Sequence, residues 1–138
     1  MIKVDYFLLC EGSLVDSEDR YTLINIFDCV TSRSLPVEVK KLVVAFSITA
    51  APDEIPEKIS LKIQFLNPKG AMFFETEGEA ERMEEDPTDP DKRLKVRASV
   101  DLTNAVPFDK YGTYHYRLLM DDIEMQTNTL EVLKKVKK

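Results

Sequence analysis

Hydrophobic and polar residues alternate with a period of two through most of the chain, and helical spacing is nearly absent. The clearest stretch is 58–67, where Ile59, Leu61, Ile63 and Phe65 alternate with polar side chains. Successive side chains of a strand point to opposite faces of its sheet. The pattern therefore predicts a strand with one buried and one exposed face.

Other stretches share this β-strand composition and are separated by turn residues. They lie near residues 2–10, 20–30, 41–50, 71–78, 93–102, 113–120 and 126–133. About eight short strands with regular turns are typical of a β-sandwich. We therefore expect an all-β fold: a single two-layer antiparallel β-sandwich of about eight strands, Ig-like or C2-like in architecture. At most one or two short helices are expected, at 79–85 and 102–111.

Two turns strengthen this expectation. Pro68 and Gly70 predict a tight turn after the strand at 58–67, with Gly70 at positive φ. Asp109 and Gly112, placed before Tyr114, resemble the corner that leads into a late strand of Ig-like and C2-like sandwiches. The resemblance implies that the hydroxyl of Tyr114 bonds back to upstream backbone.

Two segments of the chain also resemble sequence patterns of a protein family. The segment "VDYFLLC" at 4–10 has a D-Y-x-x-L-C pattern, and a later strand has a G-x-Y-x-F-x-L-x-x-D-like pattern. The matching positions of the later strand are Gly112, Tyr114, Tyr116, Leu118 and Asp121. The chain here resembles an uncharacterised bacterial family of small cytoplasmic domains of unknown function, although Phe27-Asp28 stands where a glycine is expected. The resemblance implies the β fold but assigns no activity and no site residues.

Length and charge restrict the classes of function. The 138 residues suit one domain, expected at 1–133 and followed by a basic tail at 134–138. The net charge is -6, and the phosphates of nucleic acids and anionic membranes require Lys and Arg. We therefore predict no nucleic-acid partner and no membrane partner.

Compartment is indicated by the apolar runs and the cysteines. Asp5 interrupts the first apolar run, and no stretch approaches the roughly 20 apolar residues of a membrane span. Cys10 and Cys29 lack the C-x-x-C spacing of a metal or redox motif. We expect a cytoplasmic protein with reduced thiols.

Catalytic motifs are missing from the sequence. His115 is the single histidine, and strand alternation places it opposite Tyr114 and Tyr116, on the surface of a sheet. No nucleophile or carboxylate pattern stands near it. We predict that the protein is not an enzyme, and a carboxylate-based site assembled by folding is kept as an alternative.

Acidic residues concentrate in loops. If consecutive strands run antiparallel, loops 11–20, 51–57, 78–92 and 121–122 emerge at one pole and carry most of the acid. Calcium takes six to eight oxygen ligands, which such loops can supply. The candidate ligands are Asp16, Glu18, Asp19, Asp86, Asp89 and Asp91.

Three interpretations of this acidic pole stay open. It is a calcium site of a Ca-dependent binding module, a docking surface for a basic protein, or a solvated surface that keeps the protein soluble. Function is otherwise unknown, and the sequence favours a non-enzymatic domain that acts through protein or ligand contact. An unprotected edge strand would also allow a homodimer.

Overall fold

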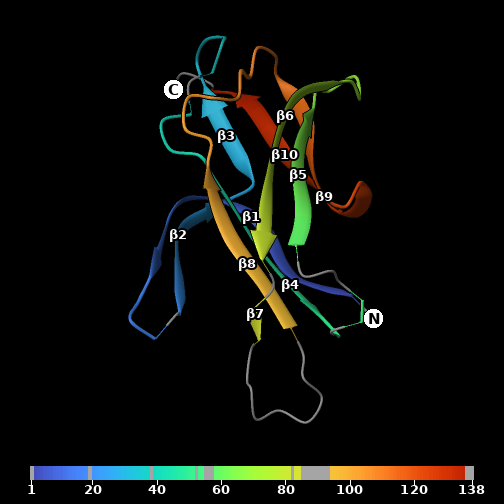
Figure 1. The fold of residues 1–138 in the computed structure, drawn as a ribbon. Helices are drawn as coiled ribbons and strands as arrows, with labels where there is room; N and C mark the ends of the chain where they lie inside the picture. The colour runs from blue at the N-terminus through green and yellow to red at the C-terminus, as the bar shows by residue number, and fades with distance from the viewer. Residues whose placement is uncertain are drawn as a thin grey trace.

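Two five-stranded sheets make up the protein (Figure 1). The computed structural model describes residues 2–18, 20–37, 39–51, 53–54, 58–81, 83–84 and 94–135. Sheet A contains, in spatial order, β2 (Tyr21–Phe27), β1 (Lys3–Val15), β4 (Val43–Ala50), β8 (Leu94–Asp101) and β7 (Met83–Glu84). Sheet B contains β3 (Cys29–Ser32), β10 (Ile123–Lys134), β9 (Gly112–Met120), β5 (Lys58–Leu66) and β6 (Met72–Glu81). The all-β prediction is confirmed.

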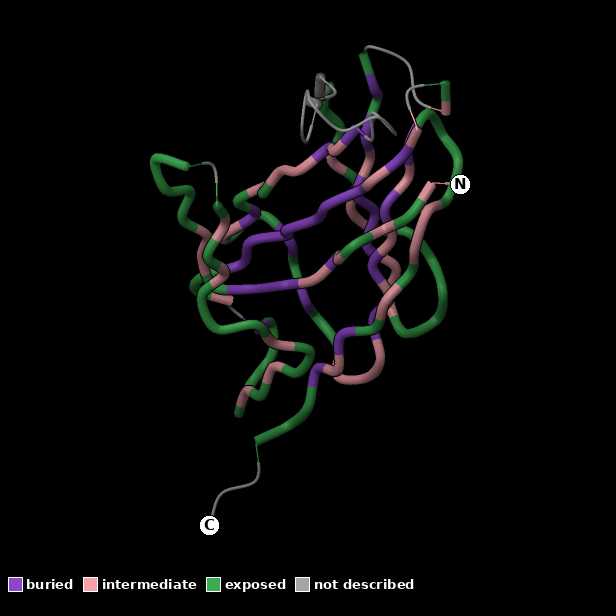
Figure 2. The backbone as a smooth tube through the Cα atoms, turned by 90° about the horizontal axis from the view of Figure 1, so that it is seen from below, coloured by how far each residue is buried: buried purple, intermediate pink, exposed green. Residues whose placement is uncertain are grey.

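The two sheets share one hydrophobic core. Phe46 and Ile48 of β4 belong to the same buried cluster as Ile59 of β5 and Leu118 of β9. Buried residues gather along these strands, whereas most of the described loop residues are exposed (Figure 2). The buried face predicted at 58–67 is confirmed, because Ile59, Leu61, Ile63 and Phe65 are all buried. The exposed face is confirmed only in part, because Gln64 is also buried, where its amide bonds Glu75. Burial of such side chains contributes about 1.5 to 3 kcal/mol each.

The predicted tyrosine corner is present. The Tyr114 hydroxyl donates to the Lys110 carbonyl and accepts from the Lys110 N–H, both at 3.1 Å. Its ring meets the Phe108 ring edge-on at 5.1 Å between centroids. Gly112 has a φ of 135°, and a Cβ there would lie 3.0 Å from Pro68, so the corner requires glycine.

Two expectations about the strands are wrong. The stretch 20–30 is not one strand: Phe27 pairs with Leu9 in sheet A, and Cys29 pairs with Glu131 in sheet B. The chain crosses between the sheets at Asp28, whose carbonyl accepts the Glu131 N–H at 2.9 Å. The sheets are also not fully antiparallel, because β3 runs parallel to β10. Alternation predicts that a residue is buried, but not which sheet it joins.

The short helices considered at 79–85 and 102–111 do not form in the described part of these stretches. Residues 79–81 and 83–84 are strand, and 102–111 is a series of turns with an isolated bridge between Val37 and Phe108. Thr103, whose N–H bonds the Asp101 carboxylate at 2.9 Å, begins these turns. Side chains of Asp, Thr and Asn that bond nearby backbone favour turns over helix.

The arrangement of the loops differs from the antiparallel scheme. β1 runs to the end of sheet A where Cys10 pairs with Val43, and residues 11–15 then turn back over the outer face, where Ser13 bonds Ser99. The other three acidic loops do share one end. Ala50 pairs with Leu94 where β4 ends, and Asp121 donates its N–H to the Ser60 carbonyl near the start of β5. Whether the tip of loop 11–20 joins them stays a prediction, because Asp19 and most residues of loops 51–57 and 78–92 lie outside the described part of the chain.

The last strand extends into the predicted tail. Lys134 pairs with Ser32, and the Lys135 N–H donates to the Ser32 carbonyl at 2.8 Å. Residues 136–138 lie outside the described part of the chain, and the domain boundary stays a prediction. Among the described residues, no helix has the length and apolar character that crossing a membrane requires.

Candidate functional site

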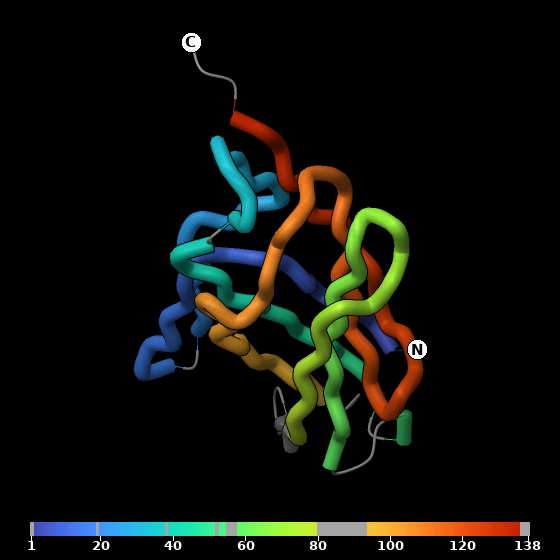
Figure 3. The backbone as a smooth tube through the Cα atoms, turned by 90° about the horizontal axis from the view of Figure 1, so that it is seen from above, coloured from blue at the N-terminus to red at the C-terminus, as the bar shows by residue number. Residues whose placement is uncertain are grey.

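A hairpin leaves sheet A and forms the most distinctive surface of the molecule. β1 pairs with β4 only as far as Cys10, and its residues 11–15 continue with β2 alone, up to the pair Val15–Tyr21. We call residues 11–15 and 21–25 the arm. Asn25 has a φ of 51°, a left-handed conformation, at the base of this hairpin. The arm occupies the left side of the molecule in Figure 1 and Figure 3.

One side of the arm packs against the outer face of sheet A. The Ser13 hydroxyl donates to the Ser99 hydroxyl at 2.8 Å. The Arg97 guanidinium stands 4.8 Å from the centre of the Tyr21 ring, and Leu23 packs on a small buried cluster formed by Cys10, Val43 and Ala45. A cation over an aromatic ring contributes about 0.5 to 1 kcal/mol at an exposed site. These contacts hold the arm against the outer face of sheet A.

Tyr6 lies under the arm. Its hydroxyl is buried and makes no hydrogen bond within the described part of the chain. Burial raises the pKa of Tyr6, and the positive charge of Arg97 acts in the opposite direction. Burial likewise raises the pKa of the Cys10 thiol, as expected for an inert core cysteine.

The free side of the arm and the adjoining end of β2 carry exposed apolar side chains. Leu14 is 60% exposed and Ile24 40% on the free side, and Ile26 is 60% exposed at the adjoining end of β2. Val15, 52% exposed, stands opposite Tyr21 and therefore on the side that faces sheet A. Isolated exposed apolar residues are common, but a group on neighbouring strands marks an interaction surface. The sequence contains one signal for this surface, since β2 ("YTLINIF") contains no charged residue and no proline.

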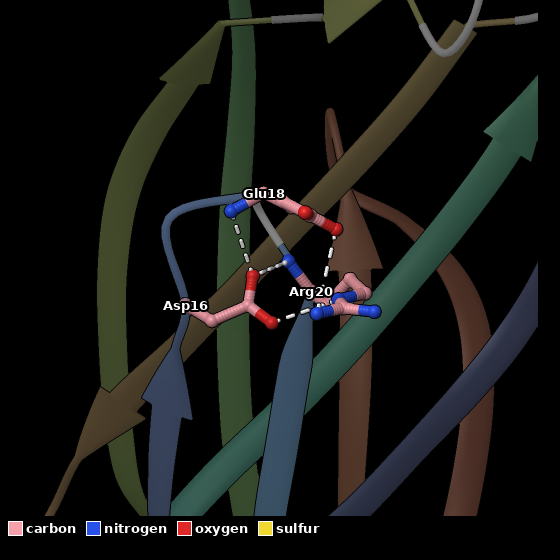
Figure 4. A network of polar contacts seen from close by, with 3 residues as sticks. All are labelled: Asp16, Glu18 and Arg20. Carbon is pink, nitrogen blue, oxygen red and sulfur yellow. Dashed lines mark hydrogen bonds and ion pairs between the residues drawn. The ribbon is translucent and has the colours of Figure 1, made fainter.

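The tip of the arm holds two of the predicted calcium ligands. The Asp16 carboxylate accepts the backbone N–H groups of Glu18 at 2.8 Å and Arg20 at 2.9 Å, and also the Arg20 side chain at 2.8 Å (Figure 4). The Arg20 guanidinium also lies 3.4 Å from the Glu18 carboxylate. The Arg20 N–H lowers the pKa of Asp16 most, and the Glu18 N–H and the Arg20 side chain lower it further. Asp16 thus closes the turn.

The other four predicted ligands, Asp19, Asp86, Asp89 and Asp91, lie outside the described residues. Among the residues that are described, no three His, Cys, Asp or Glu side chains stand close enough together to hold a metal ion. The structure therefore joins Asp16 to Glu18 through Arg20, and calcium binding stays a prediction.

The free edge of sheet B contrasts with that of sheet A. β6 is the terminal strand of sheet B, and its residues Glu75, Glu77 and Glu79 are exposed. Glu75 accepts a hydrogen bond from the Gln64 amide at 2.5 Å. Charged residues on an edge strand prevent pairing with another chain. β6 is protected in this way, whereas β2 is not.

The chain was compared with models of protein families and with curated proteins. A family model described as a family of unknown function, DUF6941, matches residues 5–133. The chain belongs to this family. The match includes both sheets and the whole arm. It confirms the resemblance to an uncharacterised family of small domains, and it assigns no activity. The chain matches none of the curated proteins with which it was compared.

A polar cluster on the outer face of sheet A was not predicted. The Asp5 carboxylate accepts the Ser47 hydroxyl at 3.0 Å and the Thr49 hydroxyl at 2.6 Å, and the Lys95 ammonium lies 4.0 Å away. These residues come from three neighbouring strands, β1, β4 and β8, so only the strand order brings them together. Both hydroxyls donate to the same carboxylate oxygen, an arrangement that satisfies buried polar groups.

His115 lies where alternation predicted it. It is half-buried on β9 between the buried residues Tyr114 and Tyr116, and it pairs with Thr129 of β10 and Leu66 of β5. These neighbours offer a hydroxyl and an aliphatic side chain. The histidine belongs to sheet B, whereas the Asp5 cluster belongs to sheet A.

Two grooves run along the open sides between the sheets. One, of about 570 Å³, lies beside Phe7, Ile26, Asp28, Tyr116 and Asn128. The Asn128 amide bridges it by donating to the Phe7 carbonyl at 2.5 Å. The other, of about 250 Å³, lies between β6 and β8 and is lined by buried core residues such as Phe46 and Ile63. Each marks a side where the sheets do not close on one another.

Proposed function

We propose that the protein is a non-enzymatic interaction domain whose contact surface is the arm with the adjoining end of β2. The observation that carries this proposal is the group of exposed apolar side chains at Leu14, Ile24 and Ile26. Apolar surface exposed to water is unfavourable by about 25 cal/mol per Å² relative to its burial. A partner that covers these side chains gains that free energy.

The arm has the rigidity that a contact surface needs. Its underside is held by the Ser13–Ser99 hydrogen bond and by the Arg97–Tyr21 contact, and its tip is closed by Asp16. A surface that is ordered before binding loses little conformational entropy on association. The arm therefore presents its apolar side in a fixed position.

Support for a non-enzymatic role comes from the polar groups themselves. In the Asp5 cluster the hydroxyls of Ser47 and Thr49 both donate to the carboxylate. A catalytic hydroxyl needs a positioned base that takes its proton, most often an imidazole. The imidazole of His115 stands on the other sheet.

We also propose that the two sheets follow an immunoglobulin-like plan. If β1, β4, β5, β6, β7, β8, β9 and β10 are taken as strands A, B, C, C′, D, E, F and G, sheet A contains the order A-B-E-D and sheet B the order G-F-C-C′. Tyr114 then stands near the start of strand F, the usual place of a tyrosine corner. In this scheme β2 is a strand added to the immunoglobulin-like order of sheet A. Functional sites of proteins that share a common fold often lie in such added segments.

The proposed location is the reducing cytoplasm. Cys10 and Cys29 are both free thiols, and Cys29 is exposed. Exposed thiols persist in reducing compartments and tend to be oxidised outside them. The state of the Cys29 thiol in protein extracted under alkylating conditions tests this location.

Site-specific photo-crosslinking tests the interaction surface. A photo-reactive amino acid replaces Leu14 on the arm in one variant and Glu77 on β6 in the other, and both are irradiated in cells that express the protein. We expect discrete covalent adducts from the Leu14 position and none from the Glu77 position. Adducts that are equal at both positions, or lacking at Leu14, would contradict the proposal.

A further inference from the structure

The identity of the partner follows from the edge of β2. Resting on the proposed function, we propose that β2 pairs antiparallel with β2 of a second copy of this chain, around a two-fold axis near Ile24. The two copies of sheet A then form one continuous sheet. Isologous two-fold contacts of this kind are the commonest way in which protein chains self-associate.

The edge of β2 is available for pairing. β2 is the terminal strand of sheet A, and within the described part of the chain its only neighbour is β1. A free edge strand presents backbone N–H and C=O groups that another strand can pair with. It spans Tyr21–Phe27, the length of an ordinary strand, with the left-handed Asn25 (φ 51°) interrupting its extended backbone beside Ile24.

Comparison with the other free edges shows why β2 is the strand that pairs. β6 carries exposed glutamates at every second position, Glu75, Glu77 and Glu79, which would face one another in a self-paired edge. β3 has four residues and β7 has two, so each offers only a short ladder. β2 is the long edge without a like-charge penalty, which matters in a chain of net charge -6.

The charges that flank β2 select a second copy and a register. With the axis at Ile24, Tyr21 stands opposite Phe27 of the second copy, and Arg20 stands opposite its Asp28. Both charged residues are exposed, and 73% of the Arg20 side chain stays accessible although it also bonds Asp16 and lies 3.4 Å from Glu18. The two-fold symmetry forms this pair of opposite charges twice. An axis at Leu23 would instead place Asp28 opposite Glu18, which repels.

The apolar side chains agree with this register. Ile24 lies on the axis and meets its own copy, and Ile26 stands opposite Thr22. β-branched residues opposite one another in antiparallel pairs stabilise a sheet by about 0.2 to 1 kcal/mol per pair. The apolar side chains that are exposed at Ile24 and Ile26 thereby gain neighbours.

The first experiment measures mass in solution. Size-exclusion chromatography with light scattering should give the wild type a mass twice the 15.8 kDa of the chain. Ile24→Lys should be monomeric, because two ammonium groups would meet at the axis. The matched control Glu77→Lys, on the other edge, should remain a dimer. Melting temperatures of both variants near that of the wild type exclude unfolding as the cause.

A disulfide test fixes the register. Opposed Cα atoms of an antiparallel pair lie about 4.5 to 5.5 Å apart, within the range of about 4.4 to 6.8 Å that a disulfide spans. In a Cys29→Ser background, Ile24→Cys should therefore form a covalent dimer on mild oxidation. Glu77→Cys in the same background should stay a monomer.

Charge exchange gives a third readout. Asp28→Arg alone should weaken the dimer, because it places two arginines opposite each other. Adding Arg20→Asp should restore the dimer.

A wild type that is monomeric at every concentration, or a dimer that Ile24→Lys leaves unchanged, would overturn the second-copy proposal. If the monomer still forms arm-specific photo-crosslinks with another protein, the interaction function stands and only the choice of partner fails. If neither a dimer nor adducts form, both proposals fail.

Discussion

β2 and β6 are each a terminal strand of one of the two sheets, lie on opposite sides of the molecule, and differ in charge (Figure 3). Both are terminal strands of ordinary length with one free edge. β6 has glutamates at alternate exposed positions, whereas β2 has isoleucines at 24 and 26 and no charge. The difference teaches that an acidic chain can close one edge by repulsion and leave the other open. We therefore propose that the uncharged edge, β2, is the edge that binds a partner.

The largest expected effect separates apolar side chains of the core from those of the arm. Ile59 on β5 is fully buried, so Ile59→Ala should lower the free energy of unfolding by about 2 to 5 kcal/mol. Ile26 is 60% exposed, so Ile26→Ala should change it by about 0.5 kcal/mol or less. Urea denaturation at low protein concentration measures both. Equal losses would show that β2 belongs to the core.

Removing charge from β6 should make the two edges more alike. Glu77→Thr with Glu79→Thr removes two of the four glutamates of β6, and we expect larger assemblies that light scattering detects. The control removes two exposed acids away from any edge, with Asp53→Asn and Asp109→Asn. If the β6 variant assembles no more than this control, glutamates are not what closes the edge.

The tyrosine corner offers a smaller effect, remote from both edges. Tyr114→Phe removes two hydrogen bonds to Lys110 and should cost about 1 to 3 kcal/mol. Dimer mass should stay unchanged. A dimer lost with this substitution would show that the association depends on overall stability and not on β2.

The same residue predicts a dependence on alkaline pH. Burial raises the pKa of Tyr114 above its ordinary value of 10.0, and the bonds to Lys110 backbone oppose part of the rise. The unfolded chain therefore releases this proton first, so its contribution to stability is present below pH 10 and declines as the pH rises further. Urea denaturation across this range should show a shallower decline for Tyr114→Phe than for the wild type. Parallel declines would contradict the assignment.

The smallest effect is expected at the tip of the arm. Asp16 already accepts three hydrogen bonds, two from Arg20 and one from Glu18, so calcium would have to displace them. We expect no shift in melting temperature between calcium chloride and EDTA at equal ionic strength. A ligand that binds only the folded protein raises its stability, so a clear shift that Asp16→Asn abolishes would restore the calcium module.

Particular residues show how far sequence reasoning reached. Ile59 and Tyr114 were placed in the core because their neighbours alternate in polarity, and the hydroxyl bond of Tyr114 was anticipated from Asp109 and Gly112. The positive φ of Gly70 was also predicted from the turn chemistry of "NPKG", and it is 85°. Each of these predictions depends on residues that are close in the chain.

The candidate site was not reached in the same way. The sequence predicts that Asp16 and Glu18 face other acidic loops, whereas the structure pairs both of them with Arg20 at the tip of a hairpin that packs over sheet A. The sequence pattern predicts only that Ile24 and Ile26 belong to a strand. Their exposure depends on β2 being terminal in its sheet, and sequence alternation does not encode which strand is terminal.

By itself, the sequence determined the β class, most strand positions, the core faces and two turns, because period-two alternation and turn chemistry are local. Tertiary structure alone decided that the segment 20–30 divides at Asp28, that β3 runs parallel to β10, and that Asp5 meets Ser47 and Thr49. It also decided which edge is open. Strand order is set by the packing of two whole sheets around a shared core, and no short stretch of chain contains that information.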